Sequence, residues 1–143
     1  MHGWGTPILG LTLLIFTPPN HLAGQQKTCT DAEERQAEKA VDMLKTWDQV
    51  YRAYKRFAQC DDGAIAEGFS DSVGKLLAND WRYFPRLVRL VESDKDFENF
   101  VVKHVDDSLT SKTLEKISKH ATLNCPPNAK RLCNAIEAAA SGK

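Results

Sequence analysis

The chain has 143 residues, 42% of them hydrophobic and 27% charged, and its 19 basic side chains balance 19 acidic ones. A neutral chain without a basic tract offers little to a phosphate backbone, so this composition argues against a nucleic-acid partner. Residues 25–143, which follow an uncharged N-terminal segment, are enough for one hydrophobic core and too few for two, which predicts a single domain.

The N-terminal segment has the pattern of a signal peptide. Residues 1–24 contain no Lys, Arg, Asp or Glu and include an apolar run over residues 8–16. Spanning a bilayer takes ~20 apolar residues, so the run is too short for a membrane span, and no later stretch approaches that length. Two prolines and the small residues Ala23 and Gly24 follow it. We therefore predict that residues 1–24 are cleaved and that the mature protein is periplasmic or secreted.

The first predicted helix is long. Thr30 and Glu33 form a capping-box pattern at its start, and the sequence Cys60-Asp61-Asp62-Gly63 ends it. Between them, apolar side chains recur at spacings of three and four, which predicts one unbroken amphipathic helix to about Gln59. These side chains are Ala37, Ala40, Val41, Leu44, Trp47, Tyr51, Tyr54 and Phe57.

A second helix is predicted over about residues 62–78, with one buried face formed by Ile65, Phe69, Val73 and Leu76. Gly68 and Gly74 lie in its interior, where each glycine costs roughly 1 kcal/mol relative to alanine. We expect this cost to be offset by close contact with another backbone or with a bound partner.

The remaining residues also show helical spacing. Pro85 divides a short helix or turn over residues 80–84 from a helix over residues 85–92. Further helices are expected to begin at Ser93, at Thr110 or Ser111, and after Cys125-Pro126-Pro127. No segment alternates with the two-residue period of a strand. The predicted fold class is all-α, a single compact bundle of about five to six helices tied by disulfides.

The cysteine positions constrain this bundle further. At ~1.5 Å per residue, the long first helix would separate Cys29 from Cys60 by ~40 Å, whereas a disulfide needs Cα atoms within about 7 Å. We therefore predict that Cys29 and Cys60 do not pair, and that each bonds to Cys125 or Cys133. Which bonds to which stays open, and a Cys125 to Cys133 pair with two free thiols is the competing interpretation.

An acidic cluster surrounds the start of the second helix. Asp61 and Asp62 suit the N-terminal cap of a helix, and Glu67 and Asp71 lie one turn apart on a solvated face. We interpret the acidic cluster first as a helix cap with a solvated face, and second as an acidic patch that binds a partner. Paired carboxylates also serve glycoside hydrolysis, so a small envelope hydrolase using Glu67 with Asp71 or Asp62 is an alternative.

Other catalytic patterns are weaker. His104 and His120 stand sixteen residues apart, without a four-residue histidine pair or a Cys-x-x-Cys sequence, so we predict no metal and no cofactor. Ser70 and Ser72 lack the Gly-x-Ser-x-Gly context of an activated nucleophile. The sequence therefore predicts a protein without enzymatic activity.

Aromatic and basic side chains indicate an interaction surface. Trp81, Tyr83 and Phe84 follow one another too closely to point the same way, so at least one should emerge beside Arg82 and Arg86. A second basic group, residues 52, 55 and 56, marks the end of the first predicted helix. The predicted contact residues are Asp61, Asp62, Glu67, Trp81 and Arg86.

The segment CDDGAIAEGFSDSV, residues 60–73, resembles part of small secreted helical proteins of bacteria. Through Cys60, Gly63, Ile65 and Gly68, with Cys125-Pro126 as a second element, the chain looks like the periplasmic immunity proteins that neutralise type VI amidase effectors. The resemblance implies an all-helical, disulfide-tied inhibitor of a cell-envelope hydrolase, with a protein partner in the envelope. It assigns no inhibitory residue. A lipid or small-ligand carrier, which requires an apolar cavity between helices, is a further alternative.

Overall fold

The computed structural model describes residues 1–3 and 27–142, so most of the predicted signal peptide lies outside the described residues. The described residues form helices and no strand, as the predicted fold class requires, and none of these helices is long and apolar enough to cross a membrane. Residues 27–142 contain seven α-helices, slightly more than predicted. Their bounds are α1 (Asp31–Val41), α2 (Trp47–Phe57), α3 (Gly63–Asn79), α4 (Phe84–Ser93), α5 (Lys95–Lys103), α6 (Ser111–Leu123) and α7 (Lys130–Ala140), with short 3-10 helices η1 (Ala58–Cys60), η2 (Trp81–Tyr83) and η3 (Pro127–Ala129).

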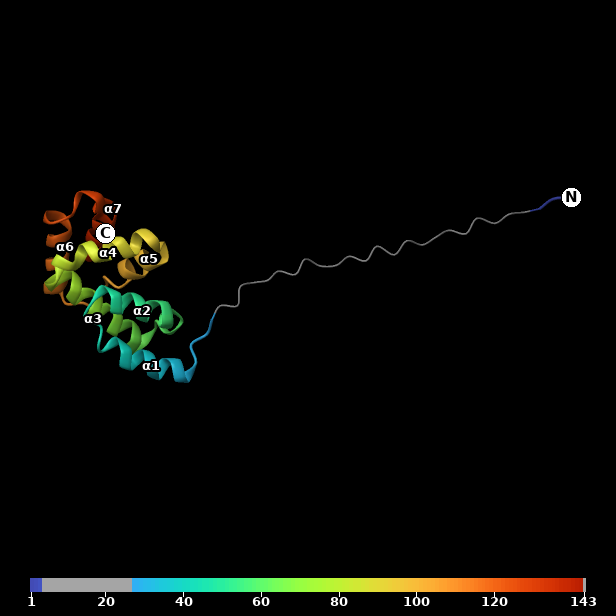
Figure 1. Ribbon diagram of the computed structural model, residues 1–143, viewed down its shortest axis with the longest axis horizontal. Coiled ribbons are helices and arrows are strands. Elements are labelled where there is room, and N and C mark those ends of the chain that lie inside the picture. Colours follow the sequence, from blue (N-terminus) through green and yellow to red (C-terminus); the bar gives the residue numbers. More distant parts are fainter. Residues whose placement is uncertain (4–26, 143) are drawn as a thin grey trace.

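The helices pack around one continuous apolar core. Helices α1 and α7 lie at opposite ends of the bundle, and α3, the longest helix, contacts α1, α2 and α6 (Figure 1). Helix α5 contacts α2, α4 and α7. The largest fully buried apolar side chains come from α2 to α7 and are Trp47, Phe69, Phe84, Phe97, Leu77, Leu87, Ile117 and Ile136.

The prediction of one long first helix is wrong, because the helix breaks at residues 42–46. Thr46 adopts an extended conformation, and its hydroxyl accepts a hydrogen bond from the Gln49 N–H at 3.3 Å. The Gln49 side chain in turn accepts one from the Lys45 N–H at 2.8 Å. Thr46 and Gln49 thus act nearly as a second capping box, and α2 folds back to contact α1.

This hairpin brings together two cysteines that the sequence analysis kept apart. Cys29 and Cys60 form a disulfide with their Cα atoms 4.9 Å apart, so the exclusion of this pair is wrong. The second disulfide joins Cys125 and Cys133, with a Cα separation of 6.1 Å. Helix α7 begins only at Lys130, which leaves Cys133 in its first turn and close to the preceding loop. All four cysteines are oxidised, and the predicted ties between the C-terminal segment and the first helix are absent from the described residues.

The interior glycines of α3 make room for neighbouring side chains. A Cβ atom added to Gly68 would lie 2.4 Å from Cγ2 and 2.8 Å from Cβ of Val41, the last residue of α1. A Cβ atom on Gly74 would lie 2.7 Å from Cδ2 of Leu109. Both glycines are therefore closely packed, but against side chains of this chain, whereas another backbone or a bound partner was predicted.

The starts of α5 and α6 follow the same capping rule. The side chain of Asp94, one residue later than predicted, accepts a hydrogen bond from the Phe97 N–H at 3.1 Å and caps α5. Ser93 instead closes α4, with its hydroxyl donating to the Leu90 carbonyl at 2.9 Å. Thr110 caps α6, as predicted, by accepting from the Thr113 N–H.

Candidate functional site

The two aspartates predicted as contact residues have partners within the fold. The Asp61 side chain is only 7% exposed and accepts a hydrogen bond from Lys103 Nζ at 2.7 Å. Asp62 caps α3, with its carboxylate accepting from the Gly63 N–H at 2.8 Å. A part of the predicted acidic patch is thus used to hold the start of α3 in place.

Trp81 and Arg86 also contact neighbouring side chains. The Trp81 ring is half-buried and stacks between Phe84 and His120, with ring centroids 4.1 and 5.3 Å away. Arg86 forms a two-point hydrogen bond with Asp48 of α2, in which its Nε lies 3.0 Å from Oδ2, and this bond lowers the pKa of Asp48. The emergent aromatic is Tyr83, 53% exposed. A contact role for Trp81 and Arg86 stays a prediction.

Glu67, the fifth predicted contact residue, is exposed and lines an open groove of about 600 Å³ between α3 and the start of α6. Asp71 lines the same groove and forms an ion pair with Lys75 at 2.5 Å. Asp62 belongs to another groove, beside the Cys29–Cys60 disulfide. Of the carboxylate pairs considered for a hydrolase, the structure therefore places Glu67 and Asp71 on one groove and Asp62 on a different one.

A buried polar cluster brings together residues that the sequence analysis did not connect. The Ser70 hydroxyl lies 2.9 Å from Nδ1 of His104 and donates to Oδ2 of Asp106 at 2.7 Å. On the other side of the ring, Nε2 of His104 lies 3.2 Å from both carboxylate oxygens of Asp61. The interior of α3, the end of α5 and two loops supply these groups, so no local motif could have revealed them.

The cluster contains Ser, His and Asp, the residue types of a hydrolytic triad, but its geometry is that of a structural network. Ser70 and His104 are each 1% exposed, which leaves no path for a substrate to the hydroxyl in this conformation. The Ser70 proton points to Asp106 and is thus unavailable to the imidazole. The cluster therefore holds α3, the end of α5 and the loop after η1 together.

Both carboxylates of the cluster are held in their ionised form. Burial acts to raise the pKa of Asp61, but hydrogen bonds from His104 and Lys103 outweigh it, so the pKa lies below its usual value. Burial likewise opposes ionisation of Asp106, and hydrogen bonds from Ser108 and Ser70 lower its pKa below the ordinary range. Because both carboxylates are ionised, Asp61 and Asp106 can only accept hydrogen bonds.

The most distinctive surface lies where α1 and α2 fold against each other. An open groove of about 840 Å³ runs between the end of α1, the 42–46 loop and α2. Its apolar lining includes Met43, whose side chain is 64% exposed, although methionine is usually buried. The other apolar or aromatic residues that line the groove are Ala40, Leu44, Tyr51, Ala53 and Phe57.

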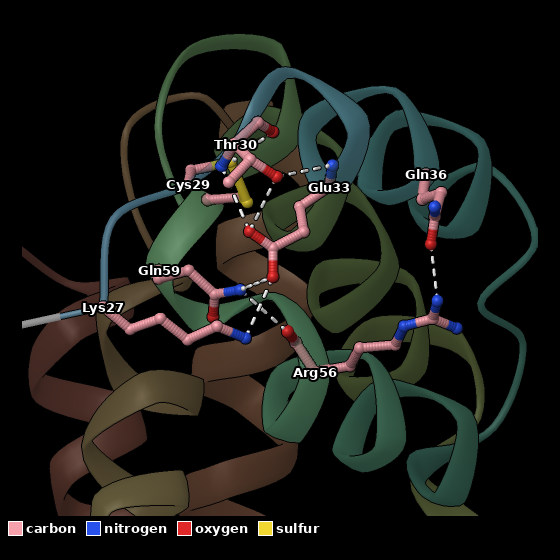
Figure 2. A network of polar contacts seen from close by, with 8 residues as sticks. Lys27, Cys29, Thr30, Glu33, Gln36, Arg56 and Gln59 are labelled. Carbon is pink, nitrogen blue, oxygen red and sulfur yellow. Dashed lines mark hydrogen bonds and ion pairs between the residues drawn. A yellow bond between two sulfur atoms is a disulfide. The ribbon is translucent and has the colours of Figure 1, made fainter.

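Four cations line the same groove, and none of its lining residues is acidic. Three of them have partners outside the lining: Lys27 pairs with Glu33, Lys55 with Asp94, and Arg56 with Gln36. Figure 2 shows two of these contacts in the network that joins the start of α1 to the end of α2. The fourth, Arg52, is exposed and makes no hydrogen bond or ion pair within residues 27–142.

Three of the four cations of this groove, residues 52, 55 and 56, were predicted as a basic group, whereas Lys27 and the groove itself were not predicted. The prediction placed residues 52, 55 and 56 at the end of one long first helix. The fold places the end of α1 and the exposed Met43 beside them, which requires the break at residues 42–46.

In comparisons with known proteins, no family model, curated protein or solved structure matches this chain. Within the described ranges there is also no group of three or more His, Cys, Asp or Glu side chains that could hold a metal ion. The chemistry of the surface itself therefore has to carry any functional conclusion.

Proposed function

We propose that this chain is a non-enzymatic protein-binding module that acts outside the cytoplasm, and that the α1–α2 groove is its contact surface. The observation that supports this most directly is the combination of an apolar lining with four cations and no acidic lining residue. An exposed apolar surface rimmed by one sign of charge is typical of interaction sites.

The charge of the groove favours a partner segment that carries acidic side chains beside apolar ones. Met43 and Leu44 would contact the apolar side chains of that segment, and Arg52 would pair with a carboxylate. Arginine is well suited to this role because its planar guanidinium binds carboxylates at two points. The most specific form of the proposal is an inhibitor or immunity protein, in which this segment belongs to a cell-envelope hydrolase.

Two features support an extracytoplasmic location. The chain has two disulfides, bonds that form and persist in oxidising compartments, and the predicted signal peptide would deliver the chain there. The Cys29–Cys60 bond also fixes the open end of the α1–α2 hairpin, so oxidation would preserve the groove.

Site-specific crosslinking tests the proposed surface. A photoreactive residue placed at Met43 in the full chain should form an adduct with an envelope protein, and the same residue at Leu123, which is 67% exposed, should not. Arg52→Glu should reduce the adduct about tenfold, as expected for a charge contact worth ~1.4 kcal/mol. Arg89→Glu, the same charge change at an exposed position on α4, should leave it unchanged.

The adduct should map to an acidic and apolar segment of the captured protein. If that protein is a peptidoglycan hydrolase, the wild-type chain should inhibit it and the Arg52→Glu variant should not. Adducts of equal yield at Met43 and Leu123, or an adduct with lipid in place of protein, would contradict the proposal.

The hydrolase alternative makes a different prediction. It would place the chemistry in the groove that contains Glu67 and Asp71, on the face of α3 next to α6. A Glu67→Gln, Asp71→Asn double variant would abolish hydrolysis of peptidoglycan under that alternative and would leave crosslinking at Met43 intact under the proposed function.

A further inference from the structure

The buried cluster around His104 carries an inference that is independent of the proposed binding surface. The imidazole is 1% exposed and contacts the ring of Phe69 on α3 and that of Phe100 on α5, with centroids 5.6 and 4.4 Å away. Three ionised side chains complete its surroundings: Asp61 from the loop after η1, Lys103 at the end of α5, and Asp106 just beyond it.

The number of available protons determines the charge of this ring. The Ser70 hydroxyl has one proton, and at 2.7 Å from ionised Asp106 it must donate that proton to the carboxylate. The Ser70 oxygen, 2.9 Å from Nδ1 of His104, can then only accept, so Nδ1 carries a proton. Nε2 faces the Asp61 carboxylate, which also only accepts, so Nε2 carries a proton too.

Each neutral form of the ring leaves an unfavourable contact. A ring protonated only at Nδ1 would direct the Nε2 lone pair at the Asp61 carboxylate, 3.2 Å away. A ring protonated only at Nε2 would have to accept a hydrogen bond from the Ser70 hydroxyl at Nδ1, which would leave two oxygen atoms, Ser70 Oγ and Asp106 Oδ2, facing each other at 2.7 Å without a hydrogen between them. Only the imidazolium gives each ring nitrogen a proton to donate to the oxygen that faces it.

We infer that His104 is held as a doubly protonated imidazolium, and that this charge fastens the Cys60–Asp61 segment to α3 and α5. Its charge also balances the cluster, since the two cations His104 and Lys103 offset the two carboxylates of Asp61 and Asp106. Without the second proton, the ring would lose one of its two polar contacts. The cluster therefore holds the segment that follows α2 in a pH-dependent way. We call these residues, Asp61, Ser70, Lys103, His104 and Asp106, the clasp.

The sign of the pH effect follows from proton linkage. If the folded chain holds the extra proton and the unfolded chain does not, the folding equilibrium weakens as pH rises above ~6.5, the ordinary histidine pKa, by up to about tenfold per pH unit. Asp61 and Asp106 act in the opposite direction, because their pKa values are lowered in the fold and their contribution is lost as pH falls below the ordinary aspartate range.

Nitrogen NMR of the histidine rings in the full wild-type chain tests the inference directly. At about pH 7.5, a unit above the ordinary histidine pKa, an exposed imidazole is mostly neutral. The His104 ring, assigned through its contacts with Phe69 and Phe100, should instead show two protonated nitrogens and two N–H protons protected from exchange. A ring with one unprotonated nitrogen at that pH overturns the inference.

Two serine variants on α3 distinguish the loss of the Ser70–His104 contact from a general loss of packing. Ser70→Ala removes the acceptor of the Nδ1 proton, so it should abolish the doubly protonated signature and flatten the fall in stability above ~pH 6.5. Ser72→Ala is the matched control, because Ser72 is also buried and donates to the Val41 carbonyl, with no hydrogen bond to His104. The Ser72→Ala variant should retain the doubly protonated signature of His104 and the fall in stability above ~pH 6.5. If both variants behave alike, the assignment of the clasp is wrong, and the wild-type spectrum decides the matter even if Ser70→Ala fails to fold.

Discussion

Two helix pairs, α1–α2 and α6–α7, lie at opposite ends of the bundle, and each contains a disulfide. The two pairs differ in where the disulfide is attached and in how many residues it spans. In α6–α7 the Cys125–Cys133 bond joins the connection to the first turn of α7 and spans 8 residues. In α1–α2 the Cys29–Cys60 bond joins the outer ends of both helices and spans 31 residues. The first bond fixes a turn, whereas the second holds a hairpin together and shapes the groove between its helices.

The largest effects are expected from removing these bonds. In the chain-entropy model, opening the loop closed by Cys29 and Cys60 costs about 3.5 to 4 kcal/mol, and opening the shorter one costs about 2.5 kcal/mol. The Cys29→Ala, Cys60→Ala variant should therefore be the less stable of the two double variants in urea unfolding. Equal losses, or a larger loss from Cys125→Ala, Cys133→Ala, would show that loop length does not set the difference.

The contact between α1 and α3 should respond strongly to one added methyl group. Gly68→Ala would place a Cβ 2.8 Å from Cβ of Val41, an atom fixed to the backbone, so α1 must shift, at a cost of about 1 to 3 kcal/mol. Gly74→Ala is the matched control, because it meets only the flexible end of Leu109. The free energy of unfolding should fall less in Gly74→Ala than in Gly68→Ala, which the same unfolding experiment measures.

A result in which Gly68→Ala is stabilising would contradict the close approach of the two helices. Alanine favours a helix over glycine by about 1 kcal/mol, so any net loss measures a steric cost larger than that gain.

What could be predicted from the sequence differs between the two helix pairs for a physical reason. The apolar spacing correctly predicted the buried faces of α3 and α7, including Phe69, Val73 and Ile136. It failed between Leu44 and Trp47, because the apolar stripe continues through residues 42–46 and both helices bury it against the same core. Periodicity reports which side chains are buried, and it does not report a change in chain direction that keeps them buried.

The signal for the break was nevertheless present locally. Thr46 and Gln49 have the same spacing as Thr30 and Glu33, which the sequence analysis did recognise as a helix start. The buried His104 cluster had no such signal, because its polar groups come from three separate segments.

The cap on α2 should make a moderate contribution. Thr46→Ala removes the hydroxyl that accepts from the Gln49 N–H and should cost about 1 kcal/mol, as N-cap substitutions usually do. Thr110→Ala on α6 removes an equivalent cap and should cost a similar amount. No loss from Thr46→Ala in thermal or urea unfolding would mean that the break does not depend on this cap.

The smallest predicted effect is confined to acidic solution. The side chain of Lys27, with the backbone and hydroxyl of Thr30, lowers the pKa of Glu33 to about 2 from an ordinary 4.5 (Figure 2). Because this pKa is depressed in the fold, the contribution of Glu33 is complete above pH 4.5 and is lost as pH falls toward 2.

Glu33→Gln should therefore flatten the acid dependence of stability in this window. Glu34→Gln is the control, because the exposed Glu34 side chain accepts no hydrogen bond within the described part of the chain. Unfolding curves at neutral pH and at about pH 3 measure the difference. If the two variants have the same acid dependence, the Glu33 network is not formed in solution.

Peptide mapping without reduction tests the central structural claim, the hairpin closed by Cys29 and Cys60. Trypsin separates all four cysteines, which fall in the peptides of residues 28–35, 57–75, 120–130 and 132–143. The structure predicts a linked pair of the first two peptides and a linked pair of the last two. A bond from either N-terminal peptide to a C-terminal one would contradict the hairpin and, with it, the groove on which the proposed function depends.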